Sequence, residues 1–302
     1  MTQDIFGQET SLSSAAARTG WDAAQLGVLA HSASTAEHLG AVLAAEPGFA
    51  LGQSIKGLSL LMLGRSELLP MAREALQAAK SGTENALPRE RKYVDALEAW
   101  LLGRPSRAIA LMEEVLTEHP RDSLAMKLSH GIRFILGDPK GMRASIERVL
   151  PTYEPEHAGR GYLLGCYSFA LEETGAYEKA DVTGRQALWM APDDAWGLHS
   201  VAHVHEMTGN AQAGLDWLEG REEAWAHCNN FRYHVWWHKA LMHLDLGQVD
   251  EVMALYDAEI RKDRTDDYRD ISNATSLLMR LELDGVEVGD RWEELADLSA
   301  NR

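Results

Sequence analysis

The sequence predicts an all-α protein of about six or seven helix pairs wound into a right-handed superhelix. Composition is the first reason, because 45% of the 302 residues are hydrophobic and Leu, Ala, Glu, Met and Arg dominate over Val, Ile and Thr. The second is a series of glycines that each end an apolar helical run. They are Gly64, Gly103, Gly137, Gly175, Gly209, Gly247 and Gly285, separated by 39, 34, 38, 34, 38 and 38 residues. Such a period indicates a helix-turn-helix repeat, and glycine suits its turn because it accepts a left-handed backbone.

In chain order, Met1 to Ala17 are polar and small without a clear period, so residues 1–17 are expected to form a loose arm or a short cap. Residues 18–302 are expected to form a single solenoid domain, since the helical register resumes after the irregular stretches at 85–91, 150–159 and 261–270. The last helix has an apolar stripe of Trp292, Leu295 and Leu298. This stripe either packs inward or serves self-association, so a homo-oligomer is one expected state.

The unit of about 34 residues resembles the tetratricopeptide repeat, which has small residues where its two helices cross and a proline after the second helix. Counted from Gly103, the small residues are Ala96 and Ala108 and the proline is Pro120. Counted from Gly175, they are Ala180, Ala187 and Pro192. Small side chains let the two helices approach closely, and proline ends the second one. Two units therefore give the same register independently.

Charge and cysteine content restrict the partners and the compartment. The formal net charge of −17 repels phosphate backbones and anionic membranes, so neither nucleic acid nor a lipid surface is an expected partner. No stretch has the roughly 20 apolar residues that a membrane span needs, and the N-terminal stretch does not resemble a secretory signal. Cys166 and Cys228 match no metal or disulfide pattern and are expected to be reduced thiols. We expect a cytoplasmic protein.

The stretch from Pro192 to Gly247 contains most of the informative chemistry, with seven of the twelve histidines and five of the nine tryptophans. His199 with His203, and His234 with His238, are spaced by four residues, so each pair lies on one face of its helix. First helices of neighbouring repeats lie roughly 8–10 Å apart, so the two faces can meet in the concave groove. The expected ligand-binding residues of this groove are Tyr162, Phe169, Glu172, Trp196 and Trp237. His205 and His243 are expected in the core between paired helices.

These residue types allow several kinds of chemistry. His199, His203 and Glu206 fall within about 60° of arc on one helix and are candidate ligands for a divalent metal. Two histidines and one carboxylate suit zinc hydrolysis or non-haem iron oxygenation. Without a metal, one histidine could act as a general base that Glu206 orients. The candidate catalytic residues are His199, His203, Glu206, His234 and His238. The structural alternative is a buried hydrogen-bonded network that fixes the angle between repeats.

The stretch from about Gly161 to Trp292 resembles the tetratricopeptide repeat protein 38 family, also described as StaR-like. The matching segments are DAWGLHSVAHVHEMTG, YHVWWHKAL, LYDAEI and LLMRLELDGVEVGDRW. The resemblance implies an intracellular helical-repeat protein, and for a StaR-like relative a hydroxylase role has been suggested. It also implies a further histidine-containing helical segment after this stretch.

Three classes of function stay open from the sequence. The leading hypothesis is binding of a small molecule or short peptide in the His/Trp/Glu-lined groove. The second is an enzyme, a metal-dependent hydrolase or oxygenase, that uses the same histidines. The third is a protein-interaction scaffold. A pocket closed by the loops at 150–159 and 261–270 would favour a small ligand, whereas a long open groove would favour a peptide.

Overall fold

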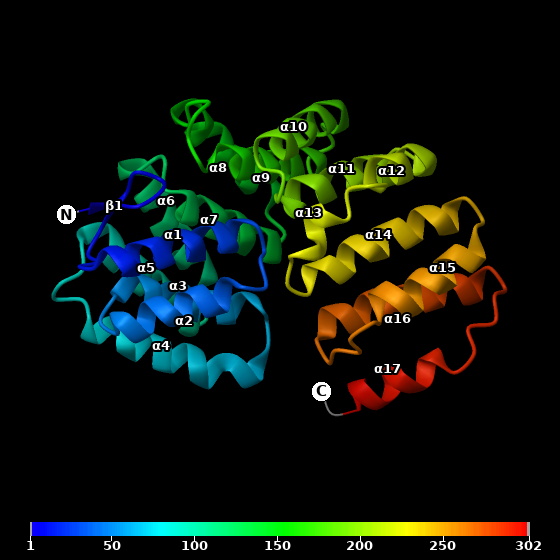
Figure 1. Cartoon of the computed structure of the whole chain (residues 1–302), viewed down its shortest axis with the longest axis horizontal. Helices are drawn as coiled ribbons and strands as arrows, with labels where there is room; N and C mark the ends of the chain where they lie inside the picture. The colour runs from blue at the N-terminus through cyan, green and yellow to red at the C-terminus, as the bar shows by residue number, and fades with distance from the viewer. Residues whose placement is uncertain (1, 301–302) are drawn as a thin grey trace. The chain divides into compact units, whose positions relative to one another are not determined.

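The computed structural model describes residues 2–300, whose regular secondary structure is helical apart from one pair of two-residue strands (Figure 1). The all-α helical-repeat fold predicted from the sequence is therefore confirmed. The chain divides into two compact units, one ending at Gly197 and the other beginning at Leu198. Each unit is described by itself. That residues 18–302 act as one domain stays a prediction.

The first unit begins with strands β1 (Thr2–Gln3) and β2 (Glu9–Thr10), which pair antiparallel. Helical hairpins follow. Their helices are α1 (Ala15–Leu29), α2 (Thr35–Ala45), α3 (Ala50–Met62), α4 (Leu69–Ser81), α5 (Pro88–Leu101), α6 (Pro105–Glu118), α7 (Ser123–Ile135), α8 (Pro139–Val149), α9 (Arg160–Glu172) and α10 (Tyr177–Met190). Short 3-10 turns span Ser66–Leu68 and Leu150–Thr152. Sequence neighbours pack in pairs, as α3 does with α4, α5 with α6 and α9 with α10.

The second unit begins within α11 (Ala195–Met207), whose first residues belong to the first unit. Its other helices are α12 (Ala211–Leu218), α13 (Glu223–Ala226), α14 (Phe231–Asp245), α15 (Val249–Leu255), α16 (Tyr268–Leu283) and α17 (Arg291–Ser299), and a π-helical turn spans Tyr256–Ile260. The core includes Val252, Tyr256 and Leu277, and both Trp292 and Leu295 of α17 pack on it. Trp292 and Leu295 of the apolar stripe therefore pack inward, which is one of the two arrangements expected from the sequence. A homo-oligomer stays a prediction.

All seven predicted turn glycines have positive φ angles, from 67° at Gly64 to 79° at Gly285. Gly103 shows how such a turn ends a helix. Its amide donates to Trp100 O at 2.8 Å, and the next amide, of Arg104, donates to Ala99 O at 2.9 Å. This pair of bonds satisfies the last carbonyls of α5 and requires a left-handed residue between them. The glycine-based repeat register is confirmed.

The small residues also lie where the register predicts. Ala96, Ala108, Ala180 and Ala187 are each 0% exposed. At such positions a larger side chain would push the paired helices apart, because protein cores are close-packed. The helix crossings in the two best-matched repeats are therefore set by alanine.

The stretch before α1, where the sequence predicts a loose arm or a short cap over residues 1–17, is folded onto the first unit. Phe6 and Leu12 are 2% and 4% exposed. Helix α1 begins at Ala15, inside the predicted arm, because the hydroxyl of Ser14 accepts a hydrogen bond from the amide of Ala17 at 3.0 Å. A serine in this position is a strong helix start. The helical part of the chain thus begins three residues earlier than the sequence suggests.

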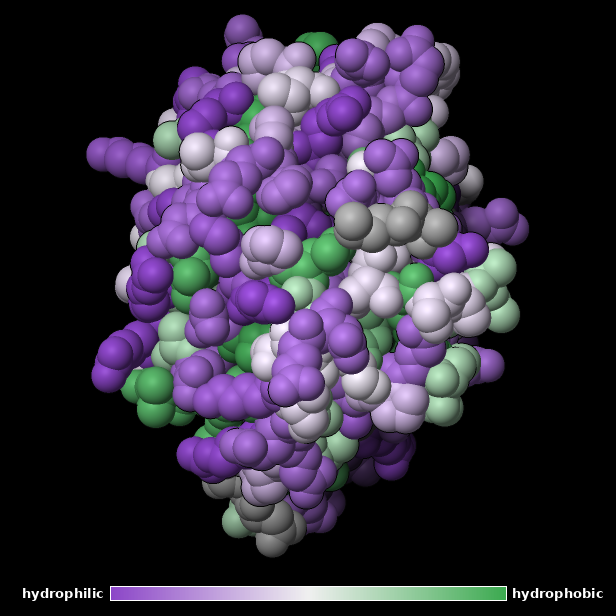
Figure 2. Space-filling model, turned by 90° about the vertical axis from the view of Figure 1, so that its left-hand side faces the viewer, coloured by the Kyte–Doolittle hydropathy of each residue, from purple (hydrophilic) through white to green (hydrophobic). Residues whose placement is uncertain are grey.

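Figure 2 shows one face of the molecule, on which hydrophilic residues predominate and hydrophobic ones appear as separate patches between them. This distribution agrees with the large negative charge of the chain, −17. Within residues 2–300, no helix combines the length and the apolar composition that crossing a membrane requires.

Replacing Gly103 by alanine should lower the free energy of unfolding by about 1–2 kcal/mol, because a Cβ is strained in the left-handed region. No atom lies within 4 Å of the added Cβ, so backbone strain alone is tested. The matched control is Gly40→Ala in α2, where a Cβ also meets nothing within 4 Å but φ is not positive. That substitution should raise stability by about 0.5–1 kcal/mol. Urea unfolding of both variants measures the difference, and equal signs would contradict the role given to Gly103.

Candidate metal centre

Four histidines on two helices of the second unit lie close together. Helix α11 holds His199 and His203, and α14 holds His234 and His238, so the four-residue spacing puts each pair on one side of its helix. His199 and His238 are each 2% exposed, whereas His203 and His234 are half-buried. The cluster therefore reaches from the interior of this unit toward its surface.

The four imidazole rings point nitrogen atoms at one another. The Nε2 atom of His238 lies 3.1 Å from His199 Nε2, 3.0 Å from His203 Nε2 and 3.1 Å from His234 Nε2. One ring nitrogen from each histidine lies within 4.8 Å of those of the other three. Four ring nitrogens gathered this closely are candidate ligands of a single ion.

The outer nitrogens of two rings contact oxygen acceptors. His238 Nδ1 donates to Glu206 Oε2 at 2.7 Å, and His234 Nδ1 lies 3.4 Å from Asn273 Oδ1. An ionised carboxylate only accepts, so Glu206 places the His238 proton on Nδ1 and leaves the Nε2 lone pair facing the other rings. A carboxylate on the outer nitrogen is the common support of a metal-binding histidine.

Burial keeps two of these rings neutral. It lowers the pKa of His234 to about 4, with a smaller lowering by the nearby His203. The pKa of His238 is held well below its usual value, again chiefly by burial and then by His203 and His234. The neutral imidazole is the form that offers a lone pair to a metal, so both side chains are ready ligands near pH 7.

An aromatic side chain borders the cluster. Trp237 stacks on His234, with ring centroids 5.3 Å apart and planes inclined by 15°, and meets His238 edge-on at 4.8 Å. The Arg280 guanidinium lies 6.0 Å from the Trp237 ring centroid. Trp237 Nε1 is buried and has no acceptor among the described residues. Because an unmade hydrogen bond of a buried donor is costly, an oxygen-bearing ligand here would be stabilised.

Tryptophans on the intervening helices hold α11 and α14 in place. Trp217 of α12 donates from Nε1 to the carbonyl oxygen of Leu198 at 3.0 Å, which fixes α12 against α11. Trp225 of α13 is 0% exposed and packs edge-on against Trp236 of α14, with centroids 5.2 Å apart. The positions of the histidine pairs therefore depend on packing as well as on helix periodicity.

The structure brings together His199, His203, His234, His238 and Trp237, all predicted site residues of this unit. Glu206, predicted as a third ligand beside His199 and His203, instead contacts the outer nitrogen of His238. The structure therefore brings four imidazoles together. The predicted metal set of His199, His203 and Glu206 stays a prediction. The catalytic role predicted for these residues stays a prediction.

The two histidines expected in the core differ from this cluster. His205 lies beside Gly214 of α12, where a Cβ would come 3.1 Å from His205 Cβ, so it faces the paired helix as the register predicts. His243 is half-buried, and its Nδ1 lies 2.6 Å from Gln248 Oε1. His199 in the cluster and His205 against α12 agree with the predicted orientation of α11.

The remaining predicted ligand-binding residues belong to the first unit, where Tyr162, Phe169, Glu172 and Trp196 are all buried. Phe169 packs on Trp196 with ring centroids 4.5 Å apart, and Trp196 Nε1 donates to His130 Nε2 at 3.2 Å. Tyr162, Phe169 and Trp196 are thus engaged in the packing of their own unit. Their predicted part in ligand binding stays a prediction.

The sequence reasoning missed three polar residues around Trp196. Lys127 Nζ lies 5.2 Å from the Trp196 ring centroid, His130 accepts its indole proton, and Asp194 is 0% exposed. Burial raises the pKa of Asp194 to about 7, although the charge of Lys127 and the amides of Gly197 and Trp196 lower it. The available signal was Asp194 itself, because an aspartate before a helix favours the N-cap position.

Asp194→Asn should remove part of the pH dependence of stability. Because the folded pKa, about 7, exceeds the ordinary 3.8, the native state binds this proton more tightly, and stability is lost as pH rises from about 4 to about 7. Asparagine caps helices as well as aspartate does, so at about pH 8 the variant should be more stable by a few kcal/mol. Urea unfolding across this range measures it. Asp193→Asn, at the exposed neighbouring residue whose charge also raises the Asp194 pKa, is the control. It should have only a small part of the effect, and an equal effect there would contradict the assignment.

No protein-family model matches the chain. Among solved structures it is similar to a thermophilic TPR protein of Thermus thermophilus, with a TM-score of 0.49 and 18% identity over 63% of this chain and 99% of that one. It is also similar to the structure of Naa15/Naa10 bound to HypK-THB, with a TM-score of 0.35 and 14% identity over 85% and 39% of the two chains. The P58(IPK) TPR domain gives a TM-score of 0.28 and 13% identity over 87% and 78%. No function is carried over from these likenesses, and the repeat fold rests on the glycine-closed hairpins of the chain itself.

Proposed function

We propose that the chain is a metal-binding helical-repeat protein, in which His199, His203, His234 and His238 hold one divalent transition-metal ion. The observation that carries this proposal is the convergence of three Nε2 atoms on the Nε2 of His238, at 3.0 to 3.1 Å. In this ligand set, His234 and His238 take the place of Glu206 beside His199 and His203.

A metal explains this geometry better than a hydrogen-bonded network of imidazoles. With its proton directed at Glu206, His238 has a single lone pair on Nε2. That lone pair can accept one good hydrogen bond, but three ring nitrogens face it at hydrogen-bond distance. A central cation satisfies all four lone pairs at once. In a tetrahedral zinc site, ligand nitrogens lie about 3.3 Å apart. The three distances to His238 Nε2 would therefore lengthen by a few tenths of an ångström.

Four imidazoles favour particular ions. Imidazole nitrogen suits zinc, copper, iron and nickel, whereas magnesium and calcium take oxygen ligands. Zinc, which is most often bound by four nitrogen or sulfur ligands, is the ion that a set of four imidazoles favours most. In a first-row ion with an open coordination position, the metal would supply Lewis-acid chemistry on the side of the half-buried His203 and His234. Trp237 Nε1, a buried donor without an acceptor among the described residues, would orient a ligand there.

The resemblance to the tetratricopeptide repeat protein 38 (StaR-like) family also supports this proposal. The segments that carry it include HSVAHVHE and YHVWWHKAL, which contain all four proposed ligands and Glu206. The predicted small-molecule or peptide binding would then take place next to the ion, at Trp237. We infer that binding of the metal is the primary function and that any ligand chemistry depends on it.

Purified protein should contain a near-stoichiometric first-row metal, and the His199→Ala, His203→Ala double variant should contain almost none, because two of four ligands are lost. Elemental mass spectrometry measures the content. His243→Ala is the control, since this histidine lies on α14 outside the cluster and contacts Gln248. Metal should also stabilise the folded state by about 2.7 kcal/mol at 100 times Kd. Protein that takes up no ion before or after incubation with zinc, iron, copper or nickel salts would refute the proposal.

Glu206→Gln should weaken metal binding by about 10- to 100-fold while leaving the stoichiometry at saturating metal unchanged, because the glutamine accepts a weaker hydrogen bond from His238 Nδ1. Competition titration against a chromophoric chelator measures the affinity. If Glu206 were itself a ligand, the loss would be far larger and the bound ion would change its coordination spectrum. An unchanged affinity would show that the Glu206 contact does not support the site.

A further inference from the structure

One face of α16, in the second unit, forms a surface hollow of about 570 Å³. This volume is within the range of small-molecule sites, roughly 300–1,000 Å³. Three apolar side chains and three hydroxyl groups line most of it, namely Ile271, Met279 and Leu283 with Ser272, Thr275 and Ser276. Met279 and Leu283 are 54% and 82% exposed. Apolar side chains grouped at an exposed hollow are typical of a binding surface.

The hollow continues the helix face that carries the histidines of α14. Both α14 and α16 end at a turn glycine with positive φ. Counted back from that glycine, Ser272 takes the position of His234, and Thr275 takes that of Trp237. Side chains at corresponding positions of successive repeats lie on corresponding faces. The hollow and the candidate metal centre therefore lie on the same side of the second unit.

Two side chains of α16 join the hollow to the metal centre. Asn273 Oδ1 lies 3.4 Å from the Nδ1 of His234. The guanidinium of Arg280, which lines the hollow, lies 6.0 Å from the centroid of the Trp237 ring, and that ring stacks on His234. A molecule that lies in the hollow and contacts Arg280 is therefore next to the aromatic ring that borders the histidines.

Arg280 gives the hollow a single positive charge. Its Nη1 atom donates to the carbonyl oxygen of Ser276 at 3.2 Å and to the hydroxyl of the same residue. Among residues 2–300 it pairs with no carboxylate, whereas Arg232, Arg261 and Arg291 of the same unit each do. A guanidinium presents a planar fork of donors that fits a carboxylate. Arg280 thus has donors left for an acidic ligand.

Charge and hydropathy together define this ligand. The chain has a formal net charge of −17, so a molecule with several negative charges would be repelled. One carboxylate matches the one guanidinium. The exposed side chains of Met279 and Leu283 would be covered by a hydrocarbon body, which removes apolar surface from water.

We propose that the ligand of the metal centre is a small amphipathic monocarboxylate that lies in the α16 hollow, with its carboxylate on Arg280. Its hydrocarbon body packs against Met279 and Leu283. This assignment rests on the metal centre proposed above, because the charge of the ion adds to that of Arg280 in attracting the carboxylate.

The test uses octanoate as the probe and measures its binding to the zinc-loaded full chain by isothermal titration calorimetry. Acetate lacks the hydrocarbon body, and octan-1-ol lacks the carboxylate. Each should bind at least about ten-fold more weakly than octanoate, because apolar burial and a charged hydrogen bond each contribute more than a factor of ten.

Two variants of the hollow locate the binding. Arg280→Gln should weaken octanoate binding by about 10- to 100-fold, because the charged hydrogen bonds to the carboxylate are lost. Met279→Asp should weaken it by a similar factor, since a second carboxylate then faces the ligand. Both side chains are exposed, so folding is not affected. Lys262→Gln is the matched control, because it removes one exposed positive charge of the same unit outside the hollow.

Failure of this proposal is distinguishable from failure of the metal centre. A chain that takes up no zinc refutes the metal centre, and the ligand assigned to it falls as well. A zinc-loaded chain that binds no octanoate, or binds it equally well after Arg280→Gln, overturns the carboxylate site alone. Removing zinc with a chelator should weaken octanoate binding several-fold. An unchanged affinity would separate the hollow from the ion and overturn the assignment too.

Discussion

The left-handed glycine turn is the constraint on which the arrangement of this protein depends. It ends the first helix of seven successive hairpins, from α3 to α16, so side chains at corresponding distances before each glycine fall on corresponding faces. In the second unit this brings the histidine faces of α11 and α14 together. Gly209 and Gly247, which close these two helices, are as important for the site as the histidines themselves.

The helical repeat, its register and the histidine pairs could be predicted from the sequence because they are periodic properties. The hydrogen-bond partner of Glu206 could not be predicted in this way. Glu206 follows His203 by three residues and lies on the same face, so periodicity alone makes it a ligand beside His199 and His203. Which nitrogen of which ring it contacts depends on the approach of α14, since the observed partner is His238 of that helix.

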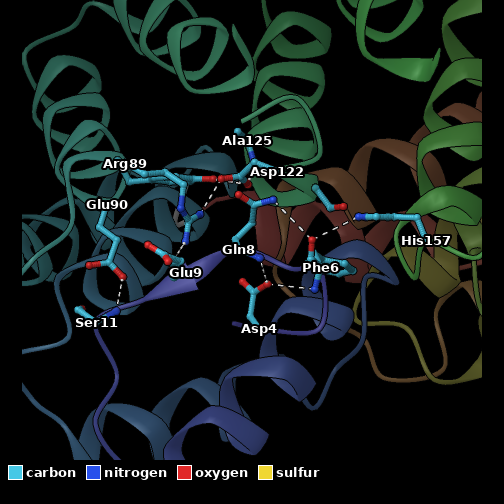
Figure 3. Close-up of polar contacts among 12 residues, drawn as sticks. Asp4, Phe6, Gln8, Glu9, Ser11, Arg89, Glu90, Asp122, Ala125 and His157 are labelled. Atoms are coloured by element: carbon cyan, nitrogen blue, oxygen red, sulfur yellow. Dashed lines mark hydrogen bonds and ion pairs between the residues drawn. The ribbon is translucent and has the colours of Figure 1, made fainter. Parts of the chain in front are cut away.

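The packing of residues 2–13, the N-terminal arm, on the first unit could not be predicted for a different reason. Its residues alternate in burial, but three of the buried ones, Asp4, Gln8 and Thr10, are polar. Hydropathy therefore shows no two-residue period. The buried polar groups are tolerated because they are hydrogen-bonded, Asp4 by the amides of Phe6 and Gln8 (Figure 3). The division of the chain within α11 was equally hidden, because the residues on both sides of Gly197 and Leu198 continue one helical pattern.

Buried and less buried residues alternate along residues 3–12. The number of residues in this segment is therefore more tightly constrained than their identity. Between the hairpins, turn glycines are separated by 34 to 39 residues, so loops have accommodated insertions without loss of the helical register. A single residue inserted between Gly7 and Gln8 would instead exchange the two sides of the following segment, exposing Leu12 and directing the charged Glu9 inward. The inter-helix loops should therefore tolerate insertions and deletions. The segment between Asp4 and Leu12 should tolerate substitutions but no insertions or deletions.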